Sequence, residues 1–343
     1  MSLNIASKKS QQKGFNIMQK SWYILGSGAI GTLWAAKFSK TAIACVLMQR
    51  GHTKLDTNER LSLKQVDGLH LDFPIQQLFL EDLSLENPPL KNTSLGELSP
   101  GQPSHQKPTI DKLLVCTKSY QTQAALERIA PLISADANIV LLQNGMGQHE
   151  QIRSLLPTQT IIAASTTEGA MLEDALKVKH TGLGISQFGS YDVLKTINDD
   201  VLNELTTIGM QQHPNIQEVL WKKLTINCVI NPLTAIFNCR NGELIENMDY
   251  RAQAQALSKE VDLIAKNLAL PISESDTFEH VRTVARATSN NYSSMHQDIK
   301  YHRKTEIEYI NGYLQHQADT LNIPLAINSS VLNRINALEA ADQ

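Results

Sequence analysis

The sequence predicts two domains: an α/β domain with a mostly parallel sheet, followed by an all-α domain, with the active site in the cleft between them. Length supports this, because 343 residues make about two domains at roughly 150 residues each. Short apolar runs alternate with helical stretches in the first part, which is typical of βαβ units. After about residue 213 the strand signals end, and apolar residues recur every three or four positions. We expect domain boundaries at 21–213 and 214–343.

Composition excludes several classes of protein. With 42% hydrophobic and 19% charged residues, the chain is neither collagenous nor wholly disordered. A net charge of −3 gives no general attraction for nucleic acid or anionic lipid, so we expect neither as a partner. The uncharged run 224–239 contains Asn and Pro and is shorter than the about 20 apolar residues of a bilayer span, so no membrane span is expected.

Cysteine and histidine usage points to a reducing compartment and to no metal site. The 4 cysteines form no CxxC pair and sit in apolar runs, which favours buried, reduced thiols and a cytoplasmic protein. The 10 histidines show no HExxH or similar spacing. Residues 1–20 are polar and lack the apolar core of a secretory signal, so we expect a disordered arm, an added extension or an alternative start near Met18. A Pro-rich surface excursion with weak order is predicted over 81–108.

Strands are predicted at 22–25, 43–48, 113–116, 139–142 and 161–164. A glycine loop joins the first strand to a helical pattern over 32–38, and it consists of Gly26, Ser27, Gly28, Ala29, Ile30 and Gly31. Gly26 permits the tight turn, Gly28 lets the backbone approach a pyrophosphate, and Gly31 lets the helix pack closely on the strand. This order predicts a Rossmann-type dinucleotide-binding domain. The competing interpretation is a Gly-rich turn before a core helix.

Three further residues follow predicted strands and are candidates for contact with a ligand. Arg50 follows the second strand, where an NAD site usually has an acid; an arginine there can pair with a 2′-phosphate, which favours NADP over NAD. Lys118 and Asn144 follow the strands at 113–116 and 139–142, at the edge where α/β sheets bind ligands. Each could instead be an ordinary solvated or turn residue.

The segment 221–232 is an apolar helix with polar residues four apart: Lys223, Asn227 and Asn231. Four-residue steps keep them on one narrow stripe, until Pro232 breaks or kinks the helix. Two asparagines and an amine suit a small, oxygen-rich ligand, and the lysine can act as an acid. A stripe that simply faces water is the alternative.

A last helix start is predicted near Ser294, which with Gln297 resembles a capping box. Free amides and a hydroxyl there can hold a carboxylate, although a serine cap needs no ligand. Glu306 stands beside basic residues, and a solvated ion pair is the simple interpretation.

Taken together, these motifs resemble the ketopantoate reductase (2-dehydropantoate 2-reductase) family. The resemblance rests on the glycine loop, on Asn-Gly-Met-Gly at 144–147, on the block 220–235, on Asn-Gly-Glu-Leu at 241–244, on Ser-Ser-Met at 293–295 and on Thr-Glu-Ile at 305–307. It covers nearly the whole chain from residue 21.

The resemblance implies NADPH-dependent reduction of ketopantoate to (R)-pantoate, a step toward pantothenate and coenzyme A. Lys223 would donate the proton, and Glu306 would order the lysine, the substrate and the cofactor ribose. The residues implied for the substrate are Asn227, Asn231, Asn241 and Ser294. Those implied for the cofactor, besides the glycine loop, are Arg50, Lys118, Asn144, Ala170 and Glu306.

Two other functions stay open. One is a reductase of another branched 2-oxo acid, and the other is a dinucleotide-binding sensor without catalysis. Retention of both Lys223 and Glu306 argues against the sensor, since a binder needs neither an acid nor its partner. A homodimer is also left open, because periodicity in one chain does not reveal an interface.

Overall fold

The computed structural model describes residues 21–52, 60–83, 109–192, 194–270 and 276–341. The expected N-terminal arm lies outside these residues, as does all of the predicted 81–108 excursion beyond residue 83. Within the described residues, the first half forms an eight-stranded sheet in the order β12-β11-β8-β7-β6-β1-β2-β5. All neighbours are parallel except β8 and β11, which confirms the predicted α/β domain.

The strands of the main sheet include all five that were predicted, with shifted ends. They are β1 (Trp22–Leu25), β2 (Cys45–Gln49), β5 (Gln76–Phe79), β6 (Ile110–Val115), β7 (Ile133–Leu141), β8 (Thr160–Thr166), β11 (Ser186–Ser190) and β12 (Gln211–Gln212). A second, four-stranded sheet has the order β4-β3-β10-β9. Its strands are β3 (Arg60–Lys64), β4 (His70–Pro74), β9 (Gly169–Asp174) and β10 (Lys177–Gly182), and none of them was predicted.

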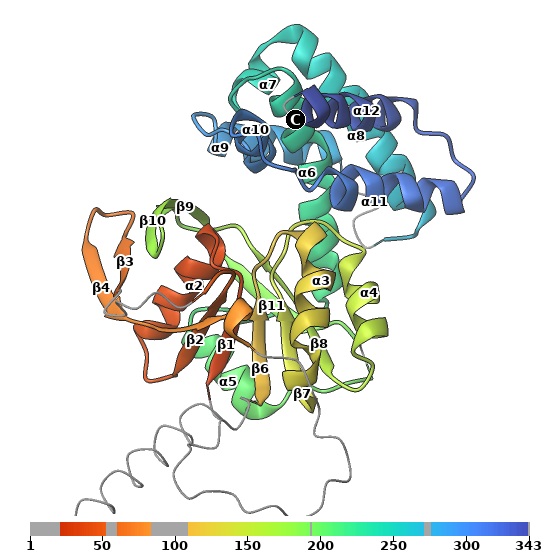
Figure 1. Ribbon diagram of the computed structural model, residues 1–343. Helices are drawn as coiled ribbons and strands as arrows, with labels where there is room; N and C mark the ends of the chain where they lie inside the picture. The colour runs from red at the N-terminus through yellow and green to blue at the C-terminus, as the bar shows by residue number, and fades with distance from the viewer. Residues whose placement is uncertain (1–20, 53–59, 84–108, 193, 271–275, 342–343) are drawn as a thin grey trace, which may run out of the picture.

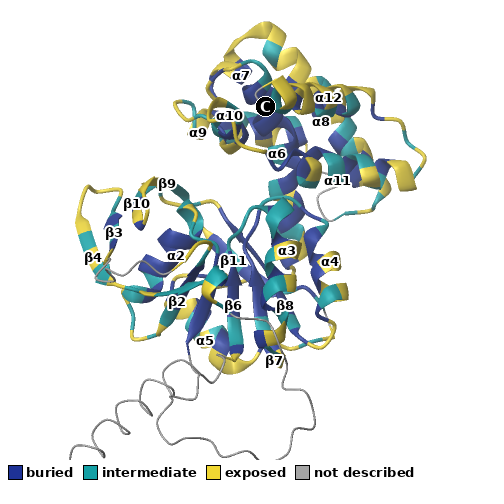
Figure 2. Cartoon of the chain, viewed as in Figure 1, coloured by how far each residue is buried: buried dark blue, intermediate teal, exposed yellow. Residues whose placement is uncertain are grey.

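Both faces of the main sheet are buried, which explains why its central strands read as continuous apolar runs (Figure 2). Alternate residues of β1 enter different cores. Tyr23 and Leu25 pack on the side of α3 (Ser119–Ile129) and α4 (Gln148–Leu155). Trp22 and Ile24 pack on the side of α2 (Ala29–Ser39) and α5 (Asp199–Thr207). The sheet is therefore a rigid base for the loops at its carboxyl edge.

The second half is all helical, as predicted. Its helices are α6 (Ile216–Ile236), α7 (Glu243–Glu246), α8 (Met248–Asn267), α9 (Thr277–Ala287), α10 (Ser294–Lys300), α11 (Ile307–Thr320) and α12 (Ala326–Ala341). The long helix α6 contacts β8 and β11 of the sheet and also the helices α8 to α12 (Figure 1). One hydrophobic core accordingly continues from the sheet into the helical domain.

A break or a kink was expected at Pro232, and helix α6 continues past it to Ile236, so the break is wrong. A proline lacks the N–H that would bond the carbonyl four residues earlier, here that of Cys228. The side chain of Asn311 from α11 supplies the missing donor, with its Nδ2 2.9 Å from the Cys228 oxygen. Asn311 is fully buried and is held in turn by the buried Asn328 of α12. Tertiary contacts thus let the helix run on to Ile236.

All four cysteines are free thiols, two of them buried and two half-buried. No helix of the described ranges is long and apolar enough to cross a membrane. In those same ranges no three His, Cys, Asp or Glu side chains are grouped so that they could hold a metal ion.

Candidate active site

The glycine loop turns tightly between β1 and α2, and each glycine has a separate role. Gly26 has a φ of +107°, a conformation that L side chains rarely adopt. A Cβ on Gly31 would lie 1.8 Å from the Gly26 carbonyl oxygen, so no side chain fits there. Gly28 is exposed, and a Cβ on it would meet nothing within 4 Å. The loop is closed on the protein side and open on the solvent side, at the start of α2.

The start of α2 fits an anionic ligand. Gly28 is its N-cap and makes no side-chain cap, and the first turn contains no acidic residue. The first backbone N–H groups of a helix lack partners inside the helix and attract negative charge. The cradle at Gly28 therefore suits the pyrophosphate of a dinucleotide.

Arg50 stands beside this loop. It directly follows β2, whose neighbour β1 leads into the loop, and the Gly26 N–H donates to the Met48 carbonyl at 3.1 Å. Arg50 is exposed and makes no ion pair with a described residue. Ala170 lies in β9, half-buried, in register with His180 of β10. Neither residue contacts the polar network described next.

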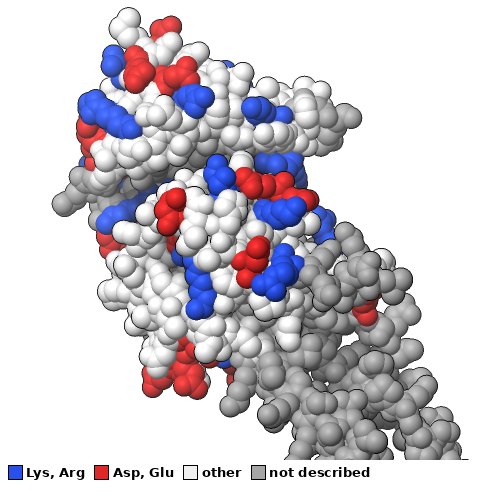
Figure 3. All heavy atoms as spheres, turned by 90° about the vertical axis from the view of Figure 1, so that its left-hand side faces the viewer, with Lys and Arg blue, Asp and Glu red and all other residues white. Residues whose placement is uncertain are grey.

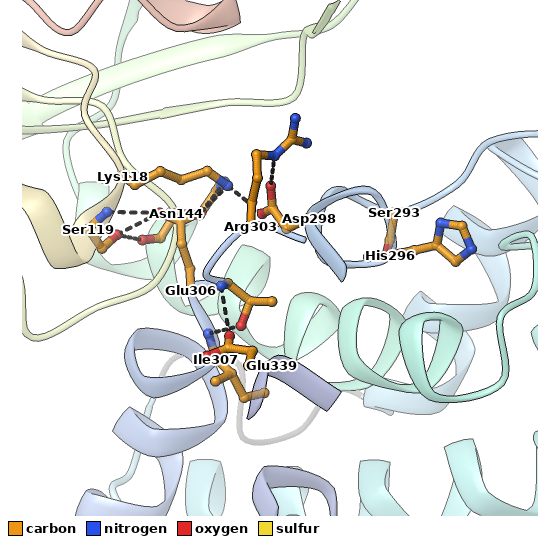
Figure 4. A network of polar contacts seen from close by, with 11 residues as sticks. Lys118, Ser119, Asn144, Ser293, His296, Asp298, Arg303, Glu306, Ile307 and Glu339 are labelled. Atoms are coloured by element: carbon orange, nitrogen blue, oxygen red, sulfur yellow. Dashed lines mark hydrogen bonds and ion pairs between the residues drawn. The ribbon is translucent and has the colours of Figure 1, made fainter. Parts of the chain in front are cut away.

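Glu306 is the centre of a network that joins the two domains (Figure 4). It immediately precedes α11, and it is 5% exposed. Its Oε1 accepts hydrogen bonds from the backbone N–H and the hydroxyl of Ser119, at 3.0 and 2.9 Å, and its Oε2 accepts from Asn144 Nδ2 at 3.2 Å. Lys118 Nζ lies 3.6 Å from Oε2. Lys118, Asn144 and Glu306, selected separately in the sequence, thus meet in space.

Lys118 also bonds to the helical domain through Asp298 of α10. Its Nζ lies 2.6 Å from Asp298 Oδ2, and Arg303 Nε contacts the other carboxylate oxygen at 3.0 Å (Figure 4). Burial lowers the pKa of Lys118, but the carboxylates of Glu306 and Asp298 outweigh it and raise the pKa above its usual value. Lys118 is consequently a fixed positive charge at the carboxyl end of β6.

Lys223 reaches from α6 to the end of β8. Its Nζ donates to the Thr166 carbonyl oxygen at 2.8 Å. Burial lowers the pKa of Lys223 from 10.5 to about 8, and the nearby charge of Glu306 opposes part of this shift. An ammonium with a pKa near working pH is suited to give up a proton in a reaction.

Two candidate substrate residues, Asn227 and Asn231, lie on α6, and Asn241 lies between α6 and α7. Asn227 is half-buried and Asn231 is 7% exposed, and neither side chain makes a hydrogen bond to a described residue. Asn241 is equally buried; its Nδ2 donates to Thr288 at 2.9 Å, while its Oδ1 has no partner among the described residues. These amides are available to an oxygen-rich ligand.

The expected capping box at Ser294 is wrong. Ser293 is the N-cap of α10, and its hydroxyl accepts from the His296 N–H at 3.1 Å. Ser294 is the first helical residue and is exposed. The prediction was displaced by one residue because two serines stand together. A hydroxyl at Ser294 that is not used as a cap stays free for a ligand.

Sequence reasoning missed Ser119, Asp298 and Glu168. Ser119 directly follows Lys118 in the sequence. Its hydroxyl, at the start of α3, is the one feature that could have indicated a site for the Glu306 carboxylate. Glu168 is 5% exposed on its side chain and lies between Lys37 of α2 and His180 of β10, with 3.0 Å to His180 Nε2. One of these partners, His180, lies on a strand that was not predicted, and Lys37 lies on the predicted helix. On the face drawn in Figure 3, Lys and Arg side chains alternate with Asp and Glu near the waist between the two lobes.

Two family models divide the chain between them. The model described as "Ketopantoate reductase PanE/ApbA" matches residues 22–193, and "Ketopantoate reductase PanE/ApbA C terminal" matches residues 215–339. The chain belongs to the ketopantoate reductase family. This confirms the resemblance that the motifs carried, and it classes the chain with oxidoreductases.

Relatives in this family are distributed across bacteria and archaea. The 2-dehydropantoate 2-reductase of Vibrio cholerae is 35% identical over 232 residues, which are 67% of this chain and 78% of the relative. The enzyme of that name from Archaeoglobus fulgidus is 28% identical over 321 residues, covering 92% of this chain and 97% of the relative.

Solved structures share the fold. A D-mandelate dehydrogenase with NADH and anilino(oxo)acetate has a TM-score of 0.80 at 21% identity, over 94% of this chain and 99% of the other. A PanE/ApbA family ketopantoate reductase from Ralstonia eutropha has a TM-score of 0.78 at 22% identity, over 94% and 99%. At these identities the likeness establishes the two-domain architecture alone.

Proposed function

We propose that this chain reduces 2-dehydropantoate (ketopantoate) to (R)-pantoate with NADPH, in the formation of pantothenate and coenzyme A. The observation that carries the proposal is the position of Lys223 on α6, with its ammonium at the end of β8 and its pKa lowered to about 8. Family membership supplies the substrate, since the curated relatives are named for this reaction.

The cofactor assignment rests on the glycine loop and on Arg50. The open cradle at Gly28 and the free amides at the start of α2 suit a pyrophosphate. A guanidinium beside this loop, with no acid in the usual place, suits a 2′-phosphate and therefore NADPH. When bound, the nicotinamide supplies the hydride chemistry, and the protein supplies position and electrostatics.

The residues of the chain then have distinct tasks. Lys223 holds the proton that neutralises the negative charge developing on the 2-oxo oxygen. Asn227, Asn231 and Asn241 offer amide groups to the other oxygens of the substrate, and Ser294 offers a hydroxyl to its carboxylate. Glu306, fixed by Ser119, orients the site and stabilises the protonated lysine.

The test is the loss of NADPH absorbance with purified protein and ketopantoate, beside NADH and beside pyruvate, 2-oxoisovalerate and phenylglyoxylate. We expect a fast loss with ketopantoate and NADPH only. A faster reaction with another 2-oxo acid would replace the substrate, and binding of NADPH without turnover on any of them would favour a sensor.

A matched pair of variants tests whether turnover depends on Lys223. Lys223→Ala should lower turnover about 100-fold or more, the usual effect of removing a general acid, and should leave NADPH binding within about twofold. Lys222→Ala, on the exposed side of the same helix, is the control. Equal turnover in both variants would remove Lys223 from the mechanism.

We also propose a homodimer, because a structurally similar ketopantoate reductase from Staphylococcus aureus is described as dimeric. Sedimentation at micromolar concentration tests this.

A further inference from the structure

A pocket that shares no lining residue with the Lys223–Glu306 network lies on the helical domain between α7, α8 and α9. Its volume is about 330 Å³, at the small end of ligand sites. Its lining consists of Ile245, Arg251, Gln255, Phe278, Arg282 and Arg286. Three of the six are arginines, and none is acidic.

Helical spacing brings these side chains together. Phe278, Arg282 and Arg286 are four residues apart and form one stripe on α9. Arg251 and Gln255 have the same spacing on the neighbouring helix α8. The two stripes face each other across the pocket, so it is built into the packing of two helices rather than formed by a loop.

Within the described residues, two of the three arginines of this pocket have no acidic partner. Arg282 pairs with Glu279 at 2.5 Å, one turn away on α9. Neither Arg251 nor Arg286 pairs with an acid among the described residues. Three guanidinium groups around one small space repel one another, and an anion removes that repulsion while accepting bidentate hydrogen bonds.

We propose that this pocket binds a phosphate group. Guanidinium groups match phosphate oxygens in geometry and charge, and the flexible amide of Gln255 adds a further donor. Phe278 and Ile245 border the pocket, but its exposed lining is mainly polar. The pocket is therefore suited to the phosphate group itself, whether that group is a free ion or part of an organic molecule.

The experiment is calorimetric titration of the full chain with phenyl phosphate and with inorganic phosphate, at constant ionic strength. We expect both probes to bind, because the phosphate group carries the charge and the oxygens that the guanidinium groups contact. Arg251→Ala combined with Arg286→Ala should weaken the binding of both about tenfold or more. Lys259→Ala, an exposed charge on α8 outside the pocket, should change neither titration.

The glycine loop is the other place where a phosphate could bind, so Gly28→Ala is titrated in parallel. Affinity lost in Gly28→Ala but kept in the double arginine variant would overturn the proposal, as would the absence of binding at about 10 mM. Equal affinity for both probes would support recognition of the phosphate group alone, and binding of only one probe would identify the source of that group. Thermal unfolding establishes that each variant is folded, and Arg286→Gln, which keeps most of the side-chain volume, replaces the double variant if that one is not.

Discussion

The carboxylate of Glu306 accepts two hydrogen bonds from Ser119, one from its backbone N–H at 3.0 Å and one from its hydroxyl at 2.9 Å, although the residues are 187 positions apart. Ser119 begins α3 of the α/β domain and Glu306 precedes α11 of the helical domain. Both are buried. This contact fixes the two halves of the site relative to each other.

Removing that hydroxyl should weaken both the fold and the site. Ser119→Ala removes the hydroxyl that the Glu306 carboxylate shares with the Asn144 carbonyl, at a cost of about 1–3 kcal/mol in the free energy of unfolding. Urea denaturation measures this. Ser119→Thr keeps the hydroxyl and is the control. Loss of stability in the threonine variant as large as in the alanine variant would show that packing, not the hydrogen bond, is responsible.

Turnover should depend on pH through Lys223. The ammonium form is the proton donor, so the rate of reduction should fall as pH rises through about 8, the lowered pKa of this lysine. Glu306→Gln removes the charge that raises this pKa, so the midpoint should move to lower pH. Rates at saturating cofactor across pH 6–10 test both statements at buffer steps of roughly half a unit. An unmoved midpoint in the glutamine variant would contradict the coupling.

Two glycines of the loop should respond in opposite ways to the same substitution. Gly28→Ala meets open space at an extended backbone conformation, so the fold should keep its stability, whereas dinucleotide binding should weaken about tenfold or more. Gly31→Ala places a Cβ 1.8 Å from the Gly26 oxygen and should cost roughly 3 kcal/mol or more. Thermal unfolding and cofactor fluorescence separate the two effects.

Cofactor preference should depend on Arg50. Arg50→Ala should weaken NADPH binding about tenfold or more and leave NADH binding nearly unchanged, because only NADPH carries the 2′-phosphate. Lys40→Ala, a cation after the end of α2, is a control for general charge. Parallel losses for both cofactors would assign Arg50 to the loop structure instead of the phosphate.

The pairing of Pro232 with Asn311 can be measured by a double-mutant cycle. Asn311→Ala leaves the Cys228 carbonyl and part of Asn328 without partners and should cost about 2–3 kcal/mol. In a Pro232→Ala background the restored N–H can bond Cys228, so the same substitution should cost less. Additive effects would mean that Asn311 acts through Asn328 alone.

The central strands and the order of the domains could be predicted because both faces of the sheet are buried. Buried parallel strands such as β6 and β7 give unbroken apolar runs that short windows detect. The strands β3, β4, β9 and β10 are half-exposed and mix polar with apolar residues, so their sequence gives no comparable signal. They form only through packing on α2 and on one another.

The candidate site likewise combines residues that the sequence could group with residues that only the tertiary fold brings together. Lys223, Asn227 and Asn231 lie on one helix, so their spacing alone places them on one stripe. Glu306 beside Arg303 and Lys304 predicted a solvated ion pair, but its partners come from Ser119, Lys118 and Asn144, which only the tertiary fold brings to it. The helix break expected at Pro232 does not occur for a similar reason, since Asn311 of another helix donates to the Cys228 carbonyl that the proline leaves without a donor.

Helix α6 also limits how the molecule can move. Its first part packs against β8 and β11, and its later part against the helices α8 to α12, without a loop between the two regions. A domain that closes over a ligand usually rotates about a few flexible loop residues. Here such a rotation would have to bend a continuous helix or shear its contacts with the sheet. We therefore expect ligand binding to cause only small displacements at the site. Because the helical domain is rigidly joined to the sheet through α6, any small rotation there moves its far end by more.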